Sequence, residues 1–91
     1  LAPELTSLEI YLNPFINNTQ IKLNSKSNEP VQFTIYNLKG QKVSSLILSD
    51  YQKSFTWIPK DMMGKTLSTG VYLISWEQGK EKGTAKLLYF K

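Results

Sequence analysis

Apolar and polar residues alternate with a period of two over most of this chain, and this pattern constrains the fold more than any other feature of the sequence. Successive side chains of a β-strand point to opposite faces, so alternation of this kind is typical of strands with one buried face. No long window carries the apolar stripe of an amphipathic helix. The sequence therefore predicts an all-β fold.

The alternation divides the chain into seven expected strands. Their approximate ranges are 8–12, 19–23, 31–36, 42–48, 55–57, 71–76 and 84–90. In the first range, Leu8, Ile10 and Leu12 are expected to face the core. The sixth range is apolar on both faces, which favours a central position in a sheet.

Glycine and proline mark the connections between these strands. Asn13–Pro14 ends the first strand, because proline has no N–H for the ladder and restricts the residue before it. Gly40 supplies a positive φ in a tight hairpin turn between the third and fourth strands. Residues 58–68 form the longest connection, and residues 78–83 read as a turn bounded by glycines.

Seven short strands in a chain of 91 residues are typical of one domain with two packed sheets. The sequence predicts a seven-stranded immunoglobulin-like β-sandwich with sheets of three and four strands around one core. A closed five-stranded barrel is the main alternative. Residues 1–7 are expected to be the end of a linker, and residues 8–91 to form the domain.

The composition bears on the class of function. The chain contains no histidine, cysteine or arginine, and its net charge of +4 comes from eleven lysines spread along the sequence. Without histidine or cysteine, no side chain supplies a base tuned near neutral pH in the ordinary way, so we expect no catalysis and no cofactor. Nucleic-acid readers favour arginine for its bidentate fork, so no nucleic-acid partner is expected.

Two tryptophans and a few acidic residues are the remaining candidates for ligand binding. Trp57 and Trp76 form a sugar-stacking platform if both are exposed, but both alternate with core positions and are expected to be buried. Asp61, Glu77 and Glu81 lack the close spacing of a calcium loop, so no metal site is expected.

The last segment of the chain combines a near-continuous apolar run with lysines. It consists of Lys86, Leu87, Leu88, Tyr89, Phe90 and Lys91. A strand in this position is well placed for a receptor that grasps the chain end or extends the sheet edge. We expect this segment to be a candidate recognition element, against the simpler interpretation of an edge strand with a solubilising lysine.

Four pieces of the sequence, taken in order, form a family pattern. They are residues 11–15 followed by 18–23, residues 33–43, residues 67–73 and residues 86–91. Together they resemble the C-terminal sorting domain, type A, of proteins exported by the type IX secretion system of Bacteroidota, which is similar to flagellar hook-capping immunoglobulin-like domains. The family signature falls on Asn13, Pro14, Phe15, Gly40, Gly70, Val71 and Tyr72.

The resemblance implies a non-catalytic sorting signal behind an N-terminal cargo domain in the same chain. It implies transit through the periplasm, passage through an outer-membrane translocon to the cell surface or medium, and usually removal by a surface sortase. It implies no small-molecule substrate. The alternative is a retained accessory or carbohydrate-binding module of a secreted hydrolase.

Each signature motif also has a purely structural interpretation. Asn13 caps a bend while Phe15 enters the core, as an alternative to direct contact with the translocon. Gly70 permits a close approach of another backbone at the start of a strand, and Tyr72 packs across the sheet.

Overall fold

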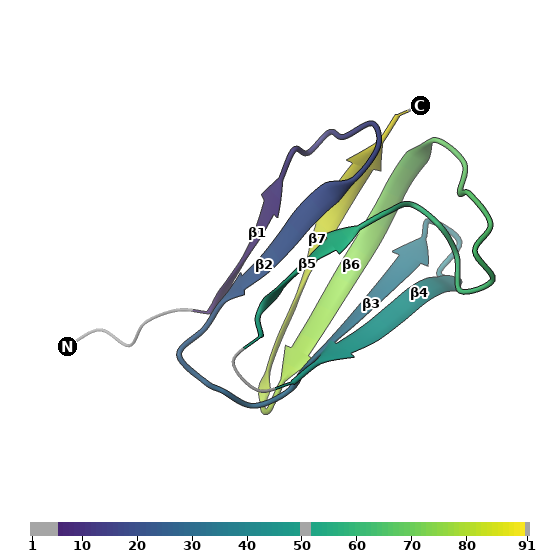
Figure 1. Ribbon diagram of the computed structural model, residues 1–91. Coiled ribbons are helices and arrows are strands. Elements are labelled where there is room, and N and C mark those ends of the chain that lie inside the picture. Colours follow the sequence, from purple (N-terminus) through teal and green to yellow (C-terminus); the bar gives the residue numbers. More distant parts are fainter. Residues whose placement is uncertain (1–5, 50–51, 91) are drawn as a thin grey trace.

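The computed structural model describes residues 6–49 and 52–90, and the described residues contain seven β-strands and no helix (Figure 1). The strands are β1 (Ser7–Tyr11), β2 (Thr19–Asn24), β3 (Val31–Asn37), β4 (Lys42–Leu48), β5 (Ser54–Trp57), β6 (Gly70–Gln78) and β7 (Glu81–Tyr89). Within this part of the chain, no helix of the length and hydrophobicity needed to span a membrane is found.

Two antiparallel sheets face each other across the core (Figure 1). One has three strands in the order β1-β2-β5, and the other has four in the order β4-β3-β6-β7. This arrangement confirms the predicted sandwich of three and four strands and excludes a single closed barrel. β6 lies between β3 and β7, so its predicted central position is also confirmed.

The alternation places one apolar row of each strand between the sheets. Val31, Phe33 and Ile35 on β3 are buried, as the sequence predicts, and Ile21 and Leu23 face them from β2. In the described part of the chain, the buried core cluster consists of Phe15, Ile21, Leu23, Val31, Phe33, Ile35, Leu48, Trp57, Tyr72, Ile74, Trp76, Leu87 and Tyr89. One core therefore supports both sheets.

The end of the first strand differs from the expectation. β1 stops at Tyr11, and Leu12 has a φ of +62° and is 71% exposed instead of facing the core. The hydroxyl of Thr19 donates to the carbonyl oxygens of Tyr11 and Leu12, which turns the chain out of the sheet before the proline. The prediction for Leu12 was wrong because this contact comes from the next strand.

The hairpin between β6 and β7 is also tighter than expected. The strands pair from Gly70 to Gln78, and the turn consists of Gly79 and Lys80. Gly83 does not end the turn but lies inside β7 opposite Trp76. A β-carbon at Gly83 would lie 2.8 Å from Nε1 of Trp76, so the indole occupies the space that any larger residue needs.

Candidate functional site

The family motifs, which are far apart in the sequence, meet at one end of the sandwich. At this end β1, β3, β5 and β7 finish and β2, β4 and β6 begin. We call it the signature end and define it by the connections 12–18, 38–41 and 58–69 with the adjoining strand ends. It occupies the upper right of Figure 1, where β7 also ends.

Asn13–Phe15, which we call the strap, pairs with the outer edge of β7. The side-chain amide of Asn13 donates from Nδ2 to the carbonyl oxygen of Lys86 at 2.9 Å, and its Oδ1 accepts from the backbone N–H of Leu88 at 2.8 Å. The N–H of Phe15 donates to the carbonyl of Leu88 at 2.8 Å, and the N–H of Phe90 donates to the carbonyl of Phe15 at 2.9 Å. The strap thus acts as a short additional strand.

Asn13 therefore has a role that the sequence did not predict. We expected its side chain to cap a local bend, but both of its hydrogen bonds go to β7, more than 70 residues along the chain. The strap runs parallel to β7 through a bridge between Phe15 and Tyr89, and its Asn13–Pro14 peptide bond is cis. Phe15 enters the core, as expected, and is 3% exposed.

Four buried aromatic residues close the core beneath the signature end. Phe15 stacks on Tyr89 with ring centroids 5.3 Å apart, and its ring meets Trp57 edge-on at 5.9 Å. Trp57 in turn meets Tyr72 edge-on at 6.0 Å. Such contacts add to the stabilisation from burial alone. The strap, β5, β6 and β7 are thereby joined through one cluster.

Two polar atoms of this cluster have distinct environments. The Tyr72 hydroxyl donates to the carbonyl of Ser68 at 2.5 Å, and burial, with a smaller effect of the neighbouring Tyr89, raises the pKa of Tyr72 above its usual value. The indole N–H of Trp57 is buried and has no hydrogen-bond partner in the described part of the chain. Trp57 and Trp76 are 4% and 7% exposed, which confirms the prediction that both are buried.

The terminal segment is divided between core and surface. Leu87 and Tyr89 are buried, Leu88 is half-buried, and Lys86 and Phe90 are exposed. Lys91 lies outside the described residues. We expected that a receptor strand could pair with the outer edge of β7. The strap already pairs with this edge from residue 86 to residue 90, so a receptor strand cannot pair there.

The remaining signature residues lie at the same end but on different strands: Gly70, Val71 and Tyr72 are on β6 next to β7, and Gly40 is in the β3–β4 turn on the far side of the four-stranded sheet. Gly40 has a φ of +82° in the β3–β4 turn, and Gly70 has a φ of +154° opposite Tyr89. No atom lies within 4 Å of a β-carbon built on Gly70, so the predicted close backbone approach is wrong and the positive φ accounts for the glycine. Val71 is half-buried on the outer face opposite Leu88.

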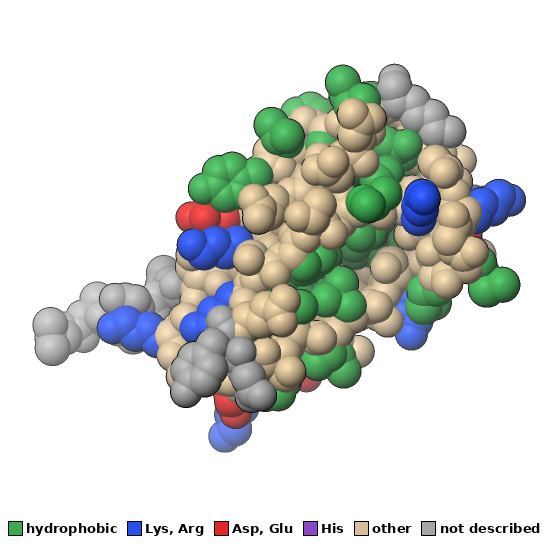
Figure 2. Space-filling view, viewed as in Figure 1, with side chains coloured by type: hydrophobic (Ala, Val, Ile, Leu, Met, Phe, Trp, Pro, Cys, Tyr) green, Lys and Arg blue, Asp and Glu red, His purple; other side chains and the backbone are tan. Residues whose placement is uncertain are grey.

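Large apolar side chains are exposed mainly at the signature end. They are Tyr11, Leu12, Ile16, Leu38, Ile58, Met62, Met63 and Phe90, which we call the apolar patch. Among the residues described, Ile47 on β4 is the one comparably exposed large apolar side chain elsewhere. In Figure 2, apolar side chains gather over this end with lysines among them. Patches of this kind mark contact surfaces more often than isolated exposed residues do.

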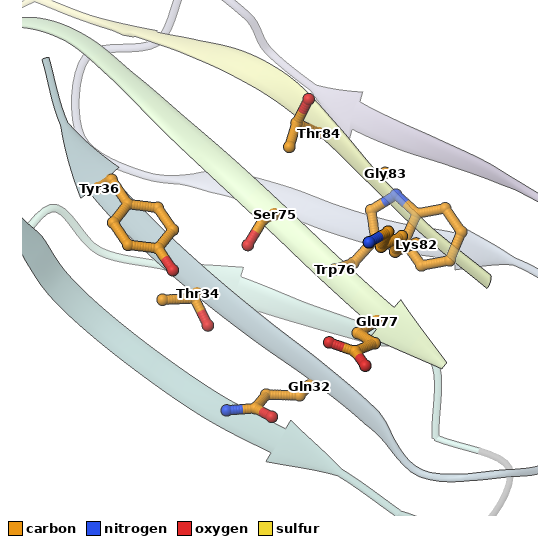
Figure 3. A pocket seen from close by; sticks show the side chains of 9 residues that line it. All are labelled: Gln32, Thr34, Tyr36, Ser75, Trp76, Glu77, Lys82, Gly83 and Thr84. Carbon is orange, nitrogen blue, oxygen red and sulfur yellow. The ribbon is translucent and has the colours of Figure 1, made fainter. Parts of the chain in front are cut away.

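A hollow of about 560 Å³ lies over the outer face of β3, β6 and β7 (Figure 3). It is lined by Gln32, Thr34, Tyr36, Ser75, Trp76, Glu77, Lys82, Gly83 and Thr84. The hydroxyl, amide and charged groups make this a polar surface. No group of histidine, cysteine or acidic side chains suited to a metal occurs within residues 6–49 and 52–90.

Comparison with known proteins gives a family match and two fold matches. A family model described as secretion system C-terminal sorting domain matches residues 9–89. The chain is similar to part of dimeric latent PorU from Porphyromonas gingivalis, with 17% identity, a TM-score of 0.72, and coverage of 98% of this chain and 10% of that one. No curated protein sequence matches the chain.

The second solved structure is PorZ, an essential bacterial surface component of the type IX secretion system of Porphyromonas gingivalis. Its identity is 13% and its TM-score 0.71, with coverage of 92% of this chain and 11% of that one. At these identities the two likenesses show the fold. The chain spans about a tenth of the length of each of these proteins.

Proposed function

This chain belongs to the family of secretion system C-terminal sorting domains, and we propose that it directs a cargo domain of the same polypeptide through the type IX translocon to the cell surface or medium. The cargo precedes residue 1, and the route passes through the periplasm. We assign residues 8–91 to the sorting domain and residues 1–7 to the end of the linker, with Ser7 at the junction because it lies in β1 and already pairs with Asn24. A surface sortase then separates the domain from its cargo. The domain itself has no catalytic role in this proposal.

The convergence of the motifs on the signature end is the observation that supports this proposal most directly. Asn13, Phe15 and Tyr72 join the terminal segment through the strap and the aromatic cluster. A receptor that reads the terminal segment therefore meets a fixed surface and not a loose tail. Such preorganisation lowers the entropy cost of recognition.

Within this surface, the signature residues and the terminal segment have different roles. Lys86 and Phe90 present exposed side chains to the translocon, and Lys91 contributes its charge from outside the described residues. Leu87, Leu88 and Tyr89 hold the segment against the sandwich. The strap, Gly70, Val71 and Tyr72 position it through pairing with β7, and Gly40 shapes the β3–β4 turn at the same end.

Export of a reporter protein tests the proposal. Residues 1–91 are fused behind a Sec-exported reporter in a bacterium with a type IX system, and the reporter on the cell surface and in the medium is measured by immunoblot. We expect the fused reporter to be exported. Export should be lost when the domain is removed from the fusion, and also when the complete fusion is expressed in a translocon-deficient strain. A folded fusion that stays in the periplasm of the intact strain contradicts the proposal.

A pair of surface variants tests the role of the terminal segment. Phe90→Ser changes an exposed side chain next to the strap, and Ile47→Ser changes a comparably apolar and exposed side chain on β4. We expect reduced reporter export for Phe90→Ser and unchanged export for Ile47→Ser, with equal thermal stability by circular dichroism. Equal export by both variants assigns recognition to another surface.

The polar hollow of Figure 3 is the observation that favours the second candidate, a retained carbohydrate-binding module. Hydroxyl and amide groups on a sheet face suit hydrogen bonds to a polysaccharide. Polysaccharide pull-down with Gln32→Ala and Thr84→Ala variants tests it, because both side chains are exposed. Absence of binding to any polysaccharide removes this candidate.

A further inference from the structure

The apolar patch is formed by the tips of the connections at the signature end, not by a groove. Met63 is 91% exposed, Leu12 71% and Leu38 68%, and each belongs to a different connection. Because water contacts most of these side chains, transfer of the patch into an apolar environment is favourable. The binding partner of this patch therefore has to be a surface into which separate protruding side chains can insert.

The charges within the same connections are mainly positive. Lys39, Lys60 and Lys65 are exposed, and Asp61 is the one acidic residue in residues 12–18, 38–41 and 58–69. The Asp61 carboxylate is half-buried and accepts the backbone N–H groups of Met63 and Lys65, each at 2.9 Å. The lysines therefore make this end mainly positive, and a positive surface complements an anionic one.

The kinds of residue in the patch favour a lipid surface over a protein partner. Protein interfaces are enriched in aromatic residues, methionine and arginine, are depleted in lysine, and have few leucines among their hot spots. The methionine and aromatic residues of the patch therefore fit either kind of surface, and its leucine and isoleucine residues, with the neighbouring lysines, decide between them. Here the most exposed tips are methionine, leucine and isoleucine, the flanking cations are all lysine, and the chain has no arginine. Aliphatic insertion with lysine ammonium groups at the level of the phosphates is typical of interfacial membrane binding.

We propose that the signature end binds the surface of a bilayer that contains anionic phospholipids. The tips of the three connections enter the boundary between head groups and acyl chains, and Lys39, Lys60 and Lys65 contact the phosphates. β1 begins at the opposite end of the sandwich, so the start of this strand lies on the side away from the bilayer (Figure 1). This binding does not depend on the translocon, although Phe90 belongs both to the apolar patch and to the segment proposed to contact the translocon.

Vesicle flotation of the 91-residue chain tests the proposal. The two vesicle populations are phosphatidylcholine alone and phosphatidylcholine mixed with phosphatidylglycerol. We expect binding to the mixed vesicles, weak binding to the neutral ones, and loss of the difference at high salt, because salt screens the lysines. Equal absence of binding to both populations overturns the proposal.

Matched variants locate the contact. The double variant Met62→Ser/Met63→Ser is expected to weaken binding to the mixed vesicles about tenfold, because two apolar tips no longer insert. Ile47→Ser, which removes an equally exposed apolar residue on β4, is expected to have no effect. A similar loss in both variants overturns the assignment to the signature end.

Charge variants and crosslinking complete the test. Lys60→Gln and Lys65→Gln are each expected to reduce binding to mixed vesicles about fivefold, and Lys22→Gln on the exposed face of β2 is expected to change it little. A photocrosslinker at position 63 is expected to label lipid in cells with a type IX system. If the crosslinker at position 63 labels one protein and the chain binds no vesicles, the patch contacts a protein partner and the proposal is overturned.

Discussion

Asn13 shows how one side chain can replace a stretch of backbone at the edge of a sheet. A carboxamide carries a donor and an acceptor in a plane, as a peptide group does. The Asn13 side chain uses both on β7, with Lys86 as acceptor and Leu88 as donor. The chain thus begins to pair with β7 before the backbone of Phe15 takes over the ladder.

Asn13→Ala is expected to lower the free energy of unfolding by about 1 to 2 kcal/mol, because two hydrogen bonds to backbone groups are lost and water replaces them only in part. Urea unfolding followed by circular dichroism measures the change. Asn17→Ala is the control, since Asn17 is exposed in the same connection and makes no hydrogen bond within the described structure. Equal stability of the two variants contradicts the assigned role.

Tyr72→Phe is expected to cost about 1 kcal/mol at neutral pH, through loss of the hydrogen bond to Ser68. Burial raises the pKa of Tyr72 in the folded state, so the unfolded chain releases the phenolic proton first. The stabilisation by the neutral phenol is full below the unfolded pKa and is lost as pH rises through the folded one. The advantage of the native protein over Tyr72→Phe should therefore shrink above about pH 10.

Urea unfolding at a series of pH values from neutral to alkaline measures this difference. Tyr11→Phe serves as the control, because Tyr11 is 58% exposed. A stability difference between native protein and Tyr72→Phe that is independent of pH up to the alkaline limit would show that the phenol is not desolvated.

Gly83→Ala is expected to destabilise the domain by about 1 to 3 kcal/mol through overpacking against the Trp76 indole. The new methyl group would lie 2.8 Å from Nε1 and 3.0 Å from two ring carbons, so the ring has to move. A shift in tryptophan fluorescence should accompany the loss of stability. Lys82→Ala, next to it on the outer face, should change neither quantity.

At the scale of elements, the strap covers only part of the outer edge of β7, so this edge has a paired part and an unpaired part. The peptide groups of Thr84, Lys86 and Leu88 point away from β6, because alternate residues of an antiparallel ladder face the same side. Leu88 and Phe90 donate to the strap, whereas the N–H groups of Thr84 and Lys86 face the part of the edge that the strap does not cover.

Hydrogen exchange distinguishes these two parts of the edge. The amides of Leu88 and Phe90 are expected to exchange slowly, and those of Thr84 and Lys86 rapidly. In Asn13→Ala, the amide of Leu88 should lose its protection. Uniform protection along the outer edge of β7 in the native protein would be inconsistent with the strap as described.

The sequence predicts the strands well because alternation is a local property. β3, β4 and β5 lie within a residue or two of their expected positions, and the β3–β4 turn at Gly40 follows from local preferences. Leu12 was misassigned because its carbonyl is held by Thr19, and Gly83 because this glycine makes room for the Trp76 indole and does not form a turn. The partners of Asn13 were not predictable, since local preferences carry no information about a contact with β7.

At the scale of the whole molecule, the signature end joins the segment after β1 to the last strand, whereas the opposite end joins the β2–β3 connection to the end of β6. There, the buried amide of Gln78 accepts from the hydroxyl of Ser25 at 2.5 Å and donates to the carbonyl of Glu29 at 2.9 Å. These contacts hold one loop. The strap instead makes the beginning and the end of the fold depend on each other, which suits the proposed recognition at the signature end.

Truncation at the N-terminus tests this dependence. A chain that starts at Leu12 lacks β1 but keeps the strap, and we expect it to fold with reduced stability because Leu8 and Ile10 no longer pack on the core. A chain that starts at Ile16 also lacks Phe15, whose buried ring and two backbone hydrogen bonds join β7. Loss of a buried phenylalanine costs about 3 to 5 kcal/mol.

That loss approaches the whole stability expected of a small domain, about 5 to 10 kcal/mol. The chain that starts at Ile16 should therefore be largely unfolded at 25 °C by circular dichroism, although β2 to β7 are all present in it. If it folds as well as the chain that starts at Leu12, the strap does not support the last strand. The terminal segment would then hold its place through β6 and the core alone, and recognition at the signature end would not need the N-terminal motif.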